Sequence, residues 1–223
     1  MKKKIKLSEI CDIYTSITVH KKMNNNNGLK YIFIPKLYNF QNVINIKIVD
    51  ELQEKKGFYI VPKEIFDLTY LLFILDSVIF KYTLEDNHKC TNNTKEILKS
   101  TLSEFLIPIV EEKELLIYKY TQTLFQISLA QLSPTNSDNV EELLHSYVLK
   151  EVKDALVLEL YYPEALKDMS IFIYPEWEKV IYTSSKEQDI EREIFRQLFS
   201  LDNQLLNSIK KLRVLWKNVL NKL

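Results

Sequence analysis

The sequence of 223 residues contains only two glycines, Gly28 and Gly57, where average usage would give about 15. The sequence therefore lacks the glycines that form the phosphate-binding loops of P-loop and dinucleotide-binding enzymes. Cys11 and Cys90 are too few to form a disulfide framework. The longest apolar run, residues 70–75, is far shorter than the roughly 18 residues of a membrane-spanning helix. With no stretch of signal-peptide type either, we expect a cytoplasmic protein that needs no cofactor and enters no membrane.

Charge is unevenly distributed along a chain that is neutral overall, with 30 Lys and Arg against 30 Asp and Glu. Residues 1–66 contain twelve lysines and six acidic residues, an excess of positive charge that can hold phosphate. A solvated lysine-rich surface is the alternative interpretation. The three arginines all lie near the C-terminus, at Arg192, Arg196 and Arg213. Since arginine is the commonest bidentate reader of guanine, base reading by the N-terminal part must depend on Lys, Asn, Gln or backbone groups.

Short apolar segments with alternating character predict three strands in the N-terminal part, at residues 30–35, 43–49 and 57–61. Asp67 is expected to cap an apolar helix that reaches about Tyr82. Together these elements predict a small mixed α/β domain over residues 1–110.

The following region changes to helical spacing. Residues 111–132 predict a spacer helix with Leu116, Tyr120, Leu124 and Ile127 along one side, and a loop follows it. Residues 138–183 predict a helical or mixed subdomain, in which Val140, Leu143, Leu144, Tyr147 and Val148 form the apolar face of a helix.

Residues 184–223 carry the clearest helical signal, because a capping-box pair, Ser184 and Glu187, precedes a long stretch without glycine or proline. We expect one coiled-coil-like helix of about 50 Å. Its apolar residues recur with heptad-like spacing and are expected to pack against another helix of this chain or of a partner: Leu198, Leu201, Leu205, Leu212, Leu215 and Val219. The predicted fold class is therefore α+β, an α/β domain followed by a helical region.

Three segments then show a resemblance to a known family: KIKLSEICDIYTSIT at residues 4–18, GFYIVPKEIFDLTYLLFILDS at 57–77, and LSEFLIPIVEEKELL at 102–116. Their order resembles a target-recognition domain of type I restriction–modification DNA specificity subunits, in shortened, half-subunit-like form. The resemblance covers about the first 130 residues. The matching positions are Ile60, Val61, Pro62, Tyr70, Leu71, Phe73, Ile74, Leu102, Ile107, Pro108, Ile109, Glu111 and Glu112.

The resemblance implies a non-catalytic subunit that recognises double-stranded DNA and docks a methyltransferase subunit, together with a restriction subunit in some systems, through its helices. A second copy of the chain bound through the C-terminal helix would supply the other half of a two-part target. The candidate DNA-binding residues are the lysines and loop asparagines of the N-terminal part: Lys3, Lys4, Lys21, Lys22, Asn24, Asn25, Asn26, Asn27, Lys30 and Lys36. Tyr31, Tyr38 and Phe40 are candidates for stacking on bases, although core packing is the usual role of such aromatics.

The alternative function is a protein-interaction or scaffold protein of the same fold that no longer reads DNA. It is favoured by the short connection from Ile48 to Gly57, where the family has a glycine-rich module. Chemical sites are weakly indicated. Glu151 and Lys153 imitate part of a nuclease metal site, but they fall on a predicted helix. The three histidines are too scattered for a zinc site. We therefore expect no enzyme activity and no bound metal.

Overall fold

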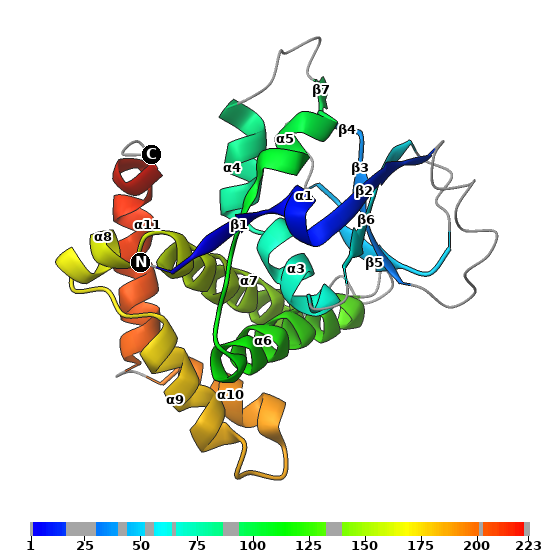
Figure 1. Cartoon of the computed structure of the whole chain (residues 1–223). Coiled ribbons are helices and arrows are strands. Elements are labelled where there is room, and N and C mark those ends of the chain that lie inside the picture. The colour runs from blue at the N-terminus through cyan, green and yellow to red at the C-terminus, as the bar shows by residue number, and fades with distance from the viewer. Residues whose placement is uncertain are drawn as a thin grey trace. The chain divides into compact units, whose positions relative to one another are not determined.

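The computed structural model describes residues 2–16, 30–39, 44–51, 56–63, 66–86, 94–132, 140–200 and 203–220, without the side chains of residues 38–39, 85–86, 94–95 and 216–220 (Figure 1). The chain divides into two compact units. Residues 3–111 form the first, here called the α/β unit, and residues 1–2 with 112–223 form the second, called the helical unit. The protein is therefore α+β.

A four-stranded antiparallel sheet organises the α/β unit, in the order β2 (Cys11–Thr15), β6 (Gly57–Pro62), β3 (Tyr31–Pro35) and β5 (Lys47–Val49) (Figure 1). The alternating segments at 30–35, 43–49 and 57–61 contain three of these strands, as predicted. The sequence pattern did not indicate β2, whose residues mix apolar and polar side chains.

One face of this sheet carries a buried cluster of Tyr31, Phe33, Val49 and Tyr59, in which the rings of Phe33 and Tyr59 lie 5.2 Å apart. Gly57 makes room for the cluster, because a Cβ atom there would lie 2.3 Å from the ring of Phe33. Alternation places the intervening isoleucines of the strands on the opposite face. The sheet is thus apolar on both faces.

Two short strand pairs complete the α/β unit. β1 (Lys4–Lys6) pairs with β8 (Leu106–Pro108), and β4 (Leu37–Asn39) pairs with β7 (Thr94–Glu96). The first pair is extended by two short helices in contact, α1 (Leu7–Ile10) and α5 (Lys99–Glu104).

The predicted cap at Asp67 is confirmed, since its Oδ1 atom accepts hydrogen bonds from the amides of Thr69 and Tyr70 at 2.9 and 3.1 Å. The prediction of one helix up to Tyr82 was wrong. α3 (Leu68–Leu75) ends before Ser77, and α4 (Val78–Asp86) begins after it. Ser77 is fully buried, and its hydroxyl accepts from the amide of Phe80 at 3.4 Å, which starts the second helix.

The helical unit contains α6 (Glu112–Gln131), α7 (Val140–Tyr161), α8 (Pro163–Asp168), α9 (Tyr174–Ser184), α10 (Ile190–Leu198) and α11 (Gln204–Leu220). α6 corresponds to the expected spacer helix, and α7 to α9 occupy the expected 138–183 region. α6 and α7 pack against each other, and the fully buried Trp177 of α9 donates from Nε1 to the hydroxyl of Thr121 at 2.7 Å. In the part of the chain that the structure describes, no helix has the length and apolar composition needed to cross a membrane.

The expected continuous helix from residue 184 to the C-terminus was wrong. Ser184 is the last residue of α9, and the following region contains two separate helices. Each restarts at a side-chain cap. Asp189 accepts from the amide of Arg192 at 3.1 Å, and Asn203 accepts from the amide of Leu206 at 2.9 Å. Asp and Asn are favoured as the first residues of helices, because their side chains accept hydrogen bonds from the next backbone amides. Here each caps a new helix, so the preceding helix does not continue through it.

Candidate functional site

The candidate DNA-binding lysines that the structure describes do not gather at one place. Lys36 lies directly after β3 and Lys30 directly before it, roughly 20 Å apart along an extended strand. Lys3 and Lys4 belong to the separate β1–β8 pair. The remaining candidates lie outside the described residues: Lys21, Lys22, Asn24, Asn25, Asn26 and Asn27.

The surroundings of these lysines differ. Lys3 and Lys30 are exposed. Lys36 forms an ion pair with Glu96, with 2.6 Å between Nζ and Oε1. Lys4 is half-buried, and this burial lowers the pKa of its ammonium group. Exposed ion pairs contribute little free energy, so Lys36 can exchange Glu96 for a phosphate group at low cost. Lys4 is less available to a phosphate group, because its side chain is half-buried.

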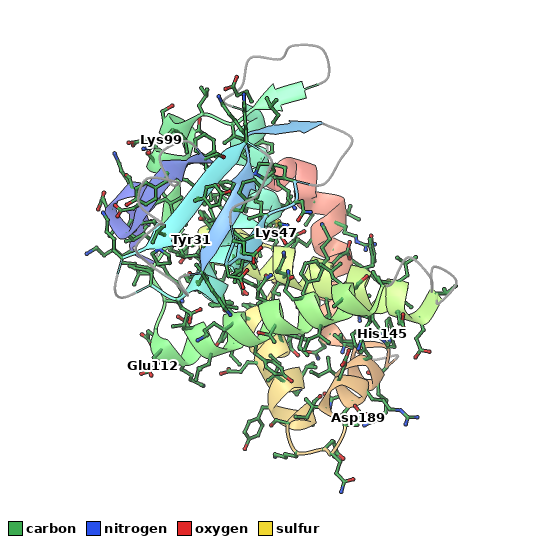
Figure 2. The ribbon with its side chains drawn as sticks, turned by 90° about the vertical axis from the view of Figure 1, so that its right-hand side faces the viewer. Tyr31, Lys47, Lys99, Glu112, His145 and Asp189 are labelled. Atoms are coloured by element: carbon green, nitrogen blue, oxygen red, sulfur yellow. The ribbon has the colours of Figure 1, made fainter. Side chains whose placement is uncertain are left out.

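Two further exposed lysines near the sheet were missed by the sequence analysis. Lys56 precedes β6, and its carbonyl accepts from the amide of Lys36 at 3.0 Å, so the two residues are neighbours. Lys47 lies on β5, opposite Phe33 in the register (Figure 2). A lysine on an edge strand also protects the sheet against pairing with other chains. Lys36 and Lys56 therefore form one pair of neighbouring candidate phosphate ligands.

Tyr31 is not a base-stacking residue in this structure. Its side chain is 3% exposed within the sheet cluster, and burial raises its pKa. The side chains of the other two aromatic candidates, Tyr38 and Phe40, lie outside the described residues. Core packing is thus the role of Tyr31.

The leucines expected to pack against another helix are mostly buried in the helical unit. Leu198, Leu205 and Leu212 are each at most 1% exposed, and α11 contacts α7 and α9. Leu215 is half-buried. Leu201 and the side chain of Val219 lie outside the described residues. The buried leucines stabilise the unit itself and are not available to a partner.

The predicted helix with an apolar face is present as α7, but the N-terminal part of that face is exposed. Four of its residues, here called the α7 stripe, remain exposed: Val140 at 75%, Leu143 at 57%, Leu144 at 44% and Tyr147 at 50%. Only Val148 of the predicted set is buried. The four residues follow the i, i+3, i+4, i+7 spacing of one helix face. Helical periodicity revealed the stripe but gave no information on what covers it.

An open cleft of about 710 Å³ lies between α6, α7 and α10 in the helical unit. Figure 2 labels His145 of α7 and Asp189 at the start of α10, two of the residues on its wall. The lining residues combine charged groups with aromatic rings: Gln131, Glu141, His145, Asp189, Glu191, Arg192, Phe195, Arg196 and Phe199. Sequence reasoning missed this cleft because it joins residues that lie far apart in the chain.

Stacked rings form the apolar part of the cleft. The rings of His145 and Phe195 are parallel within 4°, with centroids 3.5 Å apart, and the ring of Phe199 lies 6.1 Å from His145. Desolvation lowers the pKa of His145, while Glu141, whose carboxylate lies 3.9 Å away, acts in the opposite direction. The imidazole is therefore mainly neutral near pH 7 and behaves as an aromatic surface.

The charged wall is acidic on balance. Arg196 is held by Glu193 through two bonds of 2.6 Å, so its charge is largely compensated within α10. The other charged residues of the lining are Glu141, Asp189, Glu191 and Arg192, so the lining contains three carboxylates and two arginines. The cleft presents an excess of carboxylate beside an aromatic surface, a combination suited to positively charged side chains.

Groups with catalytic or metal-binding potential do not assemble in the described ranges. Glu151 binds Arg213, with 2.7 Å between Oε1 and Nε, whereas the ammonium of the buried Lys153 lies 4.3 Å from the ring of Phe125. The two residues therefore face different neighbours. Burial raises the pKa of the Cys11 thiol to about 12, which disfavours the nucleophilic thiolate. Within these ranges, no three His, Cys, Asp or Glu side chains are placed to hold a metal ion.

No protein-family model matches the chain, and no curated protein matches it. The function is therefore inferred from the residues and their geometry.

Proposed function

We propose that the protein is a non-catalytic DNA-recognition subunit, or half-subunit, of a restriction–modification or related adenine-methylation system. Its α/β unit binds double-stranded DNA, and its helical unit docks a methyltransferase subunit in the cytoplasm. The partner would perform the chemistry, as the resemblance to specificity subunits implies.

The observation that carries this proposal is the way in which the three family-like segments join. β1 of the first segment pairs with β8 of the third, in register from Lys4 and Pro108 to Lys6 and Leu106. β2 of the first segment pairs along its whole length with β6 of the second. The hydroxyl of Tyr70, from the second segment, donates to the carbonyl of Pro108 at 2.8 Å.

The three segments therefore lie in one unit, joined by backbone pairing and by one buried side-chain hydrogen bond, although 104 positions separate Lys4 from its partner Pro108. One α/β unit built from these segments is the arrangement that a recognition domain requires, and the function is proposed by analogy with the family.

The division of charge supports the assignment of roles. Residues 3–111 contain 15 Lys against 13 Asp and Glu, a net charge of +2. The helical unit contains 15 Lys and Arg against 17 Asp and Glu, a net charge of −2, and its acidic residues concentrate in 112–193, which is at −8, whereas residues 194–223 are at +5. Since DNA is a dense polyanion, the α/β unit is the part expected to bind it, and the acidic helices are expected to bind protein.

The second candidate function, a scaffold protein that no longer reads DNA, is favoured by the scatter of the lysines. Lys30 and Lys36 lie at opposite ends of β3, and Lys36 is engaged by Glu96. A scaffold needs only the exposed apolar and acidic surfaces of the helical unit. The two functions differ in one property, the salt dependence of DNA binding.

The test is fluorescence anisotropy of a labelled DNA duplex with the full chain at two or more salt concentrations. We compare the parent with Lys36→Ala and Lys56→Ala combined, and use Lys210→Ala with Lys211→Ala on α11 as a control with the same loss of charge. Each phosphate contact contributes about 0.9 to the slope of log K against log salt. The first variant is therefore expected to reduce the slope by about 1.8, and the control to leave it unchanged. Absence of salt-dependent binding by the parent would exclude DNA recognition by the chain alone and favour the scaffold.

A further inference from the structure

We infer that the α7 stripe and the adjoining cleft form one docking surface for a basic amphipathic helix of a partner protein. The partner segment has leucine-like residues along one face and Lys or Arg on its flanks. The inference deepens the proposed function, on which it rests only for the identity of the partner as a methyltransferase subunit.

The stripe and the cleft are continuous on α7. Glu141 and His145, which line the cleft, alternate along the helix with Val140 and Leu144 of the stripe. Residues one position apart lie about 100° apart around a helix of 3.6 residues per turn. The side chain of Leu144 therefore stands between the exposed face of α7 and the rim of the cleft.

The C-terminal limit of the stripe is set by α11. Arg213 donates from Nη2 to the hydroxyl of Tyr147 at 2.7 Å and lies over its ring, with Cζ 5.2 Å from the centroid. Beyond Tyr147, the next residue along this face is Glu151, which the same Arg213 binds. The apolar surface therefore covers about two helical turns, a length suited to one amphipathic helix.

Apolar area of this kind is uncommon on a single protein. The four stripe residues are between 44% and 75% exposed, and Phe199, beside the cleft, is 43% exposed. Scattered exposed apolar residues are ordinary, whereas a group at helical spacing beside a cleft marks an interaction site.

The negative charge of this surface indicates a positively charged partner. The stripe lies in the segment 112–193, whose net charge is −8. Three carboxylates, Glu141, Asp189 and Glu191, stand at the cleft beside two arginines, of which Arg196 is paired with Glu193. An acidic helix would be repelled and DNA would be excluded, while Lys and Arg side chains would find carboxylates and aromatic rings together.

A second copy of this chain fits less well. Its basic helix is α11, which carries Lys210, Lys211 and Arg213, but three of the apolar residues of α11 are buried in its own unit, with Leu205 at 1%, Ile209 at 3% and Leu212 at 1% exposure, and Val214 alone is strongly exposed among its described side chains, at 81%. To offer an apolar face, α11 would have to leave its unit. A different protein is therefore the occupant that the surface favours.

The test uses the full chain and two synthetic 18-residue helical peptides. Both have Leu at positions i, i+3, i+4 and i+7; one carries Lys at the flanking positions and the other Glu. Binding is measured by anisotropy of the labelled peptide. We expect saturable binding of the Lys peptide and at least tenfold weaker binding of the Glu peptide.

Paired variants locate the site. Leu143→Ser with Leu144→Ser, and separately Glu141→Gln with Glu191→Gln, are each expected to weaken binding of the Lys peptide at least fivefold. The matched controls are Leu116→Ser with Tyr182→Ser, two exposed apolar residues elsewhere in the unit, and Glu164→Gln with Asp168→Asn on α8. The controls are expected to bind as the parent does.

Three results would overturn the inference: equal affinity for the two peptides, parent-like binding by both stripe and cleft variants, or a dimer of the free chain that the Leu143→Ser and Leu144→Ser changes dissociate. The last result would assign the surface to a second copy. The DNA measurement under the proposed function is independent of these peptides, so a chain that binds DNA but not the Lys peptide keeps the first proposal and loses this one.

Discussion

The buried hydrogen bond between Trp177 and Thr121 gives the sharpest test of the helical unit. Both residues are fully buried, and the bond from indole Nε1 to the hydroxyl joins α9 to α6 at 2.7 Å. Thr121→Val preserves the shape of the side chain and removes the acceptor. An unsatisfied buried donor costs about 1–3 kcal/mol, and the added methyl group recovers at most about 0.8 kcal/mol. We therefore expect a loss of about 1–2 kcal/mol in the free energy of unfolding.

A double-mutant cycle separates this bond from other effects of the substitution. In a Trp177→Phe background no indole N–H remains, so Thr121→Val is expected to cost less than about 0.5 kcal/mol. Thr123→Val is the matched control, since Thr123 is exposed on the same helix, and its hydroxyl bonds the carbonyl of Lys119 as that of Thr121 bonds Ile117. That control is expected to stay within about 0.5 kcal/mol of the parent.

The assay is urea unfolding at constant pH. Far-UV circular dichroism follows all variants. In the variants that keep Trp177, a Trp216→Phe background makes the tryptophan fluorescence report on the surroundings of Trp177 alone, because the chain has only two tryptophans, both in the helical unit. An equal cost of Thr121→Val with and without the indole would refute the reasoning, as would a cost no larger than that of the Thr123 control.

Three further predictions concern Gly57 and Cys11 of the main sheet and the Glu159 carboxylate of the helical unit. Gly57→Ala should destabilise the α/β unit by about 1–3 kcal/mol in urea unfolding, since the new Cβ atom would meet the ring of Phe33 at 2.3 Å; an unchanged midpoint would contradict the close approach. The Glu159 carboxylate accepts the first amides of α9 at 3.2 and 2.6 Å, and burial raises its pKa. The pKa of Glu159 is higher in the folded than in the unfolded protein, so its protonated form stabilises the fold. This contribution to the free energy of unfolding is fully present below the unfolded pKa and is lost as pH rises through the folded pKa. Stability should therefore fall more between about pH 4 and about pH 7 in the parent than in Glu159→Gln, and parallel curves would refute this. The buried thiol of Cys11, with a pKa of about 12, should resist a disulfide reagent at about pH 8 in folded Cys90→Ser protein and react after unfolding; rapid labelling of the folded form would show that β2 opens.

Three strands of the main sheet were predictable because their signal is local. The segments 30–35 and 57–61 alternate apolar side chains within a few residues, and Asp67 precedes an apolar run, so their elements follow from propensity and capping. The breaks between α3 and α4 and between α10 and α11 were not foreseen, because neither place contains the Gly or Pro that usually ends a helix. At these two places the side chains of Ser77 and Asn203 accept hydrogen bonds from backbone amides and start the second helix of each pair.

The surfaces were less predictable than the elements. Periodicity identified an apolar face on Val140, Leu143 and Leu144, but the same pattern is typical of a buried face and of an unpartnered one. Only the tertiary structure shows that α7 buries its later residues and leaves these exposed. The cleft beside them needed α10 to place Phe195 on His145, a contact between residues 50 positions apart in the chain.

The distribution of charge connects the two proposals, because the acidic residues that would attract a basic partner would also weaken DNA binding. Under the two proposals, DNA would be attracted by the α/β unit, with its net charge of +2, and repelled by the acidic residues of 112–193, at −8, which residues 194–223 offset in part with +5. The acidic segment carries the exposed apolar stripe, so the surface proposed for a basic protein partner is one that would repel DNA. Binding of such a partner would reduce this repulsion. Affinity for DNA is therefore expected to rise in the complex, and to rise most at low salt, where the repulsion that the partner removes is least screened.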